Sequence, residues 1–229
     1  MPTEDPFLTR RARLKAPKAA AIAGIVFSVL LIISLVLILS LVAPDLSDAT
    51  PGVIPNQALM VLALNLVPFA GIAFLWFMGA VRDRLGDRED QFFATVFFGS
   101  GLLFLAMLFV SSAVAGGLIL PYDVASTDPI TSDYSMLGRT IAREILSNYG
   151  IRMAGVFMIS ACTLFIRTQV IPRWMTWIGY AFAALMLLRI GYIGRLGWVF
   201  LLFPVWVLLV SGYVLVDNYR GKESVDSLN

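Results

Sequence analysis

The sequence contains no histidine, and it has one cysteine, Cys162, in 229 residues. The absence of histidine excludes histidine-ligated haem, the usual zinc-protease motif, a Ser-His-Asp triad and a histidine proton relay. A single cysteine cannot close an intramolecular disulfide, and no histidine is present to activate it as a nucleophile. We therefore expect no catalytic residue, no metal site and no cofactor, and we lean towards a non-enzymatic role.

Charge is also scarce. Charged residues make up 14% of the chain and hydrophobic residues 59%. Soluble domains typically have about 25% charged and about 45–50% hydrophobic residues. A soluble protein of this size would have too little polar surface to cover so much apolar material. The net charge of +2 is small, and its basic residues form no stripe, which excludes nucleic-acid binding. The composition is that of an integral membrane protein in a lipid bilayer.

Six apolar stretches are long enough to cross a bilayer, which takes roughly 20 helical residues. They are about 19–43, 57–80, 91–119, 150–168, 174–193 and 197–217. We predict an all-α integral membrane bundle of six transmembrane helices in one domain, 19–217. A basic N-terminal segment, 1–18, precedes it and a short tail, 218–229, follows. The fifth and sixth stretches form a hairpin or fuse into one bent element.

The lysines and arginines are unevenly divided between the two sides of this predicted topology. With the N-terminus inside, twelve of the 17 basic residues fall on the inner side. The five on the outer side are Arg139, Arg143, Arg152, Arg189 and Arg195. Because basic residues concentrate on the cytoplasmic side of membrane proteins, we predict that both termini are cytoplasmic.

The connection before the fourth span carries a helical pattern of its own. Leu137, Ile141 and Ile145 are four residues apart, and charged residues lie on the opposite side. This spacing predicts an outer amphipathic helix before span four. Two arrangements remain open for 134–149: a separate helix at the outer interface, or an extension of span four beyond the bilayer.

The stretch "RIGYIGR" joins the fifth and sixth spans and raises the question of a binding site. Two interpretations are open for Arg152, Arg189, Tyr192 and Arg195. The first, which membrane interfaces favour in general, is a belt of arginine and aromatic side chains that extend to the headgroups. The second is a site at the outer face that binds an anionic lipid headgroup or a small anion.

Asn65 is the most polar residue inside a predicted span, and it stands three residues before Pro68. Three uses of its amide are open: a bond to a carbonyl that the proline frees, a bond to another helix, or a contact with a solute in a cavity. Small residues also recur at four-residue spacing, as in Gly179 with Ala183. Such faces favour close helix packing, and they are compatible with a homo-oligomer or a membrane-protein partner.

Two stretches carry a resemblance to a known group of proteins. Residues 151–188, with Pro172–Arg173–Trp174 followed by Gly179–Tyr180, and residues 92–117 are similar to uncharacterised bacterial multi-pass membrane proteins, actinobacterial ones among them. The resemblance implies a bacterial plasma membrane location. It implies no activity, and no functional residue is transferred from it.

These observations favour a non-enzymatic accessory or lipid-associated membrane component. A passive channel or transporter for a small solute is the alternative, and a water-filled cavity at Asn65 and Pro68 would favour it. A third hypothesis is an enzyme that acts on lipid headgroups at the outer face, with acidic residues gathered near Arg152 and Arg189. The candidate acids are Asp123, Asp128, Asp133 and Glu144.

Overall fold

A computed structural model describes residues 6–42, 57–85, 91–118, 129–168, 171–188 and 199–226, with most of their side chains. In these ranges every regular element is a helix, which confirms the all-α prediction. The helices are α1 (Pro6–Val42), α2 (Gln57–Leu85), α3 (Gln91–Leu118), α4 (Pro129–Glu144), the π-helix η2 (Ile145–Gly150), α5 (Ile151–Thr168), α6 (Arg173–Leu187) and α7 (Val199–Asp226).

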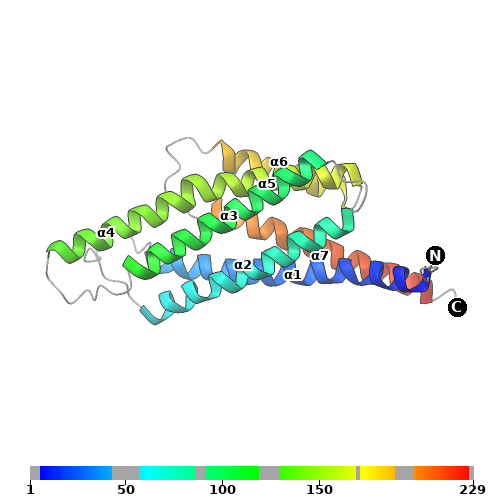
Figure 1. Ribbon diagram of the computed structural model, residues 1–229, viewed down its shortest axis with the longest axis horizontal. Coiled ribbons are helices and arrows are strands. Elements are labelled where there is room, and N and C mark those ends of the chain that lie inside the picture. The colour runs from blue at the N-terminus through cyan, green and yellow to red at the C-terminus, as the bar shows by residue number, and fades with distance from the viewer. Residues whose placement is uncertain are drawn as a thin grey trace, which may run out of the picture.

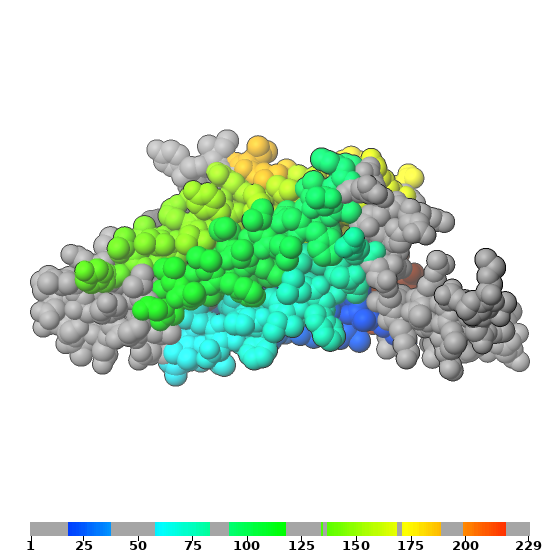
Figure 2. Space-filling model, viewed as in Figure 1, coloured from blue at the N-terminus to red at the C-terminus, as the bar shows by residue number. Residues whose placement is uncertain are grey.

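Successive helices run in opposite directions along one bundle, with α4, η2 and α5 forming a single rod (Figure 1). The start of α1 and the end of α7 lie at the same end of the bundle (Figure 1). Helix α1 packs against α2 and α7, while α5 packs against α3 and α6. On the face in Figure 2, α2, α3 and the α4–α5 rod lie side by side. The two groups of helices meet along a shared apolar core.

Among the described residues, five helical segments are long and apolar enough to cross a membrane. They are Lys18–Leu37, Ala58–Arg82, Phe92–Gly117, Leu137–Thr168 and Val199–Asn218. The fifth predicted span differs, because α6 has 15 residues, or about 22 Å of helix at 1.5 Å per residue. The rest of that predicted span, together with the hairpin turn, lies outside the described residues. The membrane-helix character is therefore clear, whereas the fifth predicted span, 174–193, and with it the number of six spans, stay predictions.

The fourth candidate span begins well before the fourth predicted stretch. Helix α4 continues through η2 into α5 without a break, so the whole rod measures about 60 Å. A rod of this length exceeds the thickness of a bilayer with its headgroups, about 40–45 Å. Residues 134–149 are therefore continuous with α5 rather than a separate helix, and their position relative to the bilayer stays a prediction. A π-helical turn was not predicted, and no periodicity in the sequence marks it.

The face of α4 that meets α3 is lined with small residues. Ala142 is buried against Ala115, and the hydroxyl of Ser111 donates a hydrogen bond of 2.8 Å to the carbonyl of Ala142. The predicted apolar stripe points elsewhere, because Leu137 and Ile141 are exposed. Close backbone approach, rather than a ridge of large side chains, therefore holds α4 to α3.

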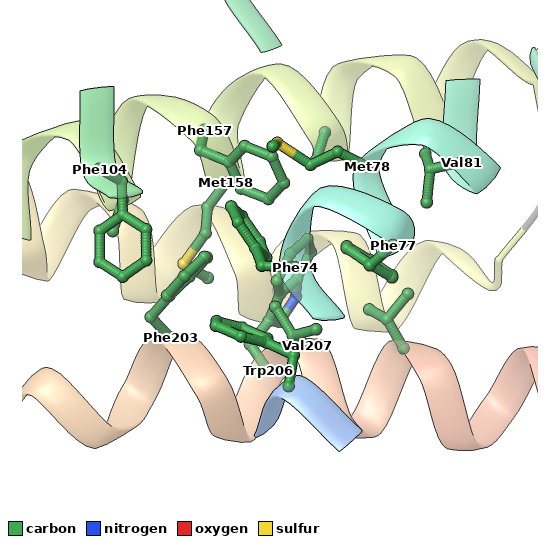
Figure 3. Packing of buried hydrophobic residues seen from close by; sticks show 14 of the residues in the cluster. Phe74, Phe77, Met78, Val81, Phe104, Phe157, Met158, Phe203, Trp206 and Val207 are labelled. Carbon is green, nitrogen blue, oxygen red and sulfur yellow. The ribbon is translucent and has the colours of Figure 1, made fainter. Parts of the chain in front are cut away.

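Phenylalanine rings from five helices fill the middle of the bundle. Phe74 on α2 lies 4.5 Å from Phe27 and 5.1 Å from Phe157, centroid to centroid. Phe157 stacks at 4.6 Å on Phe97, and Phe203 meets Phe74 edge-on at 5.7 Å. Figure 3 shows Phe74, Phe157 and Phe203 turned towards one another. These offset and edge-on geometries are those that aromatic pairs prefer.

Two glycines on the small-residue faces allow this close packing. A Cβ on Gly24 would lie 2.0 Å from Oγ of Ser211 and 2.8 Å from the ring of Phe77. A Cβ on Gly179 would lie 2.6 Å from Nε1 of Trp206. All three distances are shorter than van der Waals contact, so a larger residue at either position would push two helices apart.

Candidate functional site

One of the predicted site residues, Arg152, lies at the N-terminal end of α5, and it belongs to the part of the chain that the structure describes. Arg152 is the second residue of α5, directly after η2, and its side chain is exposed. The two preceding residues, Gly150 and Ile151, are buried, and Met153 after it is half-buried. The arginine side chain therefore points away from the core.

Helix α6 packs beside Arg152. A Cβ on Gly155, one turn further along α5, would lie 3.1 Å from Cγ of Leu187 and 3.3 Å from the carbonyl oxygen of Ala183. Because Gly155 has no side chain, the last turn of α6 can pack closely against α5, one helical turn from Arg152. Arg189, Tyr192 and Arg195 lie outside the described residues. Their convergence with Arg152 stays a prediction.

A polar pair lies on the same rod, on the N-terminal side of Arg152. The amide of Asn148 donates a hydrogen bond to the carboxylate of Glu144. Glu144, Asn148 and Arg152 follow at four-residue spacing, a pattern that is present in the sequence but was not predicted to form a site. Of the acids that the enzyme hypothesis needs, Glu144 alone has a described side chain, and its recorded partner is this amide.

Asn65 lies on the outside of the bundle. Its side chain is exposed on α2, as is Pro68 one turn later. A small cavity lies elsewhere: it measures about 10 Å³ and is lined by nine apolar side chains, among them Phe104, Ile151 and Met186. That volume is at the lower limit for one water molecule, which would also need polar partners.

The opposite end of the bundle carries cation–π contacts that the sequence did not predict. The guanidinium carbon of Arg82, at the end of α2, lies 5.1 Å from the ring centroid of Phe98. That of Arg167, at the end of α5, lies 4.8 Å from the centroid of Phe93. Both rings belong to the first turns of α3, so two arginines hold the ends of α2 and α5 to the start of α3.

In the part of the chain that the structure describes, no three acidic or cysteine side chains gather where a metal ion could bind. Cys162 is buried against Gly179 in the core. No family model, curated protein or solved structure matches the chain. The function must therefore be argued from the site itself.

Proposed function

We propose that this chain is a multi-pass protein of the bacterial plasma membrane that binds an anionic lipid headgroup without catalysing a reaction. The proposed site is at the outer end of α5 and includes Arg152. Three further residues, Arg189, Tyr192 and Arg195, are proposed to bind the same headgroup. The observation that carries the proposal is that Arg152, an exposed arginine inside a candidate membrane span, lies one turn from the contact between Gly155 and the end of α6.

The depth of Arg152 supports a lipid ligand. Arg152 precedes Arg167 by 15 positions on one helix, which corresponds to about 22 Å along the axis. If the Arg167–Phe93 contact marks the inner edge of a hydrocarbon layer about 30 Å thick, Arg152 lies in the outer leaflet, some way below the headgroups. A charge at that depth is costly unless it reaches polar groups.

The direction of the side chain favours such a reach. In a helix the Cα–Cβ bonds tilt towards the N-terminus, and the N-terminal end of α5 is its outer end in the proposed orientation. The guanidinium of Arg152 therefore extends towards the headgroups. A guanidinium binds phosphate through two parallel hydrogen bonds.

The packing of α6 supports a second arginine at the same site. Leu187 contacts Gly155, which is one turn from Arg152, and Arg189 follows Leu187 by two positions. Two arginines at one level would repel each other in lipid unless an anion lay between them. An anionic headgroup supplies that charge.

Native mass spectrometry of protein extracted gently with its own lipids tests this proposal. We expect a phosphate-bearing anionic lipid to be retained by the natural protein and lost from both Arg152→Ala and Arg189→Ala. Arg143→Ala is the matched control, because Arg143 is an exposed arginine on the same rod, two turns further out. Retention that is equal in all three variants would contradict a specific site and leave these arginines as interfacial anchors.

We also propose six spans with both termini in the cytoplasm. The support is that α1 starts where α7 ends (Figure 1), since an odd number of crossings would separate the termini. Epitope tags on both ends, probed with protease in sealed vesicles of known orientation, test this topology. Both tags should be cleaved from the cytoplasmic side, and tags on opposite sides would overturn the six-span arrangement.

A further inference from the structure

One stripe of α2 is exposed along most of the helix. It consists of Leu62, Asn65, Phe69, Ile72 and Trp76. Its apolar members are between 49% and 71% exposed, whereas Val61 and Leu75 beside it are 38% and 41% exposed. The stripe is thus the centre of the outward face, and its intervals of three and four residues are those of a heptad seam.

Asn65 is the polar member of this stripe. It lies within the candidate span Ala58–Arg82, and it makes no hydrogen bond with any described residue. Lipid tails offer no hydrogen-bond partner to an amide. An unpaired amide side chain in the bilayer therefore raises the free energy of the folded protein. Pro68 lacks an N–H and cannot donate to the carbonyl of Leu64. One turn of α2 therefore presents three polar groups without a hydrogen-bond partner among the described residues: the amide N–H and amide oxygen of Asn65, and the backbone carbonyl of Leu64.

We propose that this stripe of α2 is the contact surface for a second copy of the chain, with the two Asn65 amides hydrogen-bonded to each other. Two copies in one membrane have the same orientation, so a twofold axis along the membrane normal pairs the α2 helices in parallel. That symmetry brings both Asn65 residues to the same depth. An amide donates and accepts, so Asn65 complements its own copy.

The heptad spacing gives the pair its geometry. Helices that interlock through positions three and four apart cross at a shallow left-handed angle, as most membrane helix pairs do. A single asparagine in such a seam fixes the register, because any shift would leave both amides unpaired in an apolar contact. Leu62 and Phe69 then meet their counterparts on either side of the Asn65 pair.

Energy transfer between labelled copies in vesicles, followed as lipid dilutes the protein, measures the dimer dissociation constant. Asn65→Leu keeps the size and removes the amide, and we expect it to raise that constant roughly threefold to thirtyfold. Asn65→Gln should restore much of the affinity. Asn148→Leu, an amide substitution on another helix, should leave the constant unchanged.

Disulfide crosslinking tests the register independently. We expect Leu62→Cys and Phe69→Cys to crosslink in the membrane, and Val61→Cys and Leu75→Cys to crosslink several-fold less. Cys162 gives little background because it is fully buried. A natural protein that stays monomeric at all dilutions, an Asn65→Leu dimer as tight as the natural one, or equal crosslinking on and off the stripe would each overturn the proposal. Arg152 is not involved, so lipid retention at α5 is unaffected by any of these results.

Discussion

Phe69 and Phe74 are the same amino acid on the same helix, five positions apart, and they have opposite surroundings. Phe74 is 0% exposed and touches aromatic rings from four other helices, whereas Phe69 is 62% exposed. In a soluble protein these two faces would differ in polarity. Here they do not, because lipid tails are as apolar as a protein core. The buried face is distinguished by close packing rather than by hydrophobicity.

The largest expected effect comes from removing the ring at the centre. Phe74→Ala should lower the free energy of unfolding by about 3 kcal/mol, the low end of the range for such a cavity, because the unfolded helix also stays in an apolar solvent. Phe69→Ala should change it by less than about 0.5 kcal/mol. Unfolding in micelles, at a dilution of one chain per micelle, measures both. Equal losses would mean that the two faces are not distinguished by packing.

A smaller effect is expected where helix backbones approach closely. Gly24→Ala places a methyl group 2.0 Å from Oγ of Ser211, and it should destabilise the bundle by about 1–3 kcal/mol through overpacking. A methyl group on Gly99 of α3 would have no neighbour within 4 Å. Gly99→Ala should therefore stabilise α3 by up to about 1 kcal/mol, since alanine favours helix more than glycine. The same unfolding assay should give opposite signs. A loss of stability in both variants would contradict the packing explanation, because helix propensity favours alanine at both positions.

The smallest expected effect concerns the bond between α3 and α4. Ser111→Ala removes the hydrogen bond to Ala142 and should cost about 0.5–1 kcal/mol. Amide exchange of α4 should then quicken relative to that of α5. Ser160 is buried as well, but its hydroxyl donates to the carbonyl of Val156 on its own helix, at 3.0 Å. Ser160→Ala should have almost no effect, because that bond also exists in the separated helix. Unchanged exchange in Ser111→Ala would show that α4 is held by the Ala115–Ala142 contact alone.

The sequence predicted the helices well because each must satisfy its own backbone in lipid. It predicted α4 as a helix with an apolar stripe at Leu137 and Ile141, but it did not identify Ala142 as the contact with α3, because one small residue has no periodic pattern. It could not show the contacts of Arg82 and Arg167 with α3, because pairing between helices has no local period. Of the candidate site, Arg152 was recognisable from its charge alone. Its position beside the end of α6 depends on Gly155, whose role no pattern marks.

The amino-acid sequence by itself determined that this chain is helical and apolar enough for a membrane, because a run of about 20 apolar residues has few other stable states. It also determined which chemistries are missing, since an absent histidine cannot be supplied by folding. Only the tertiary structure decided which apolar residues are inside. It placed Phe74 in the core, left Asn65 outside, and joined α4 to α5 through a π-helical turn. The physical reason is that packing depends on shape and on close approach between distant segments. In a membrane the lipid-facing residues are as apolar as the core, so polarity does not show which residues are buried.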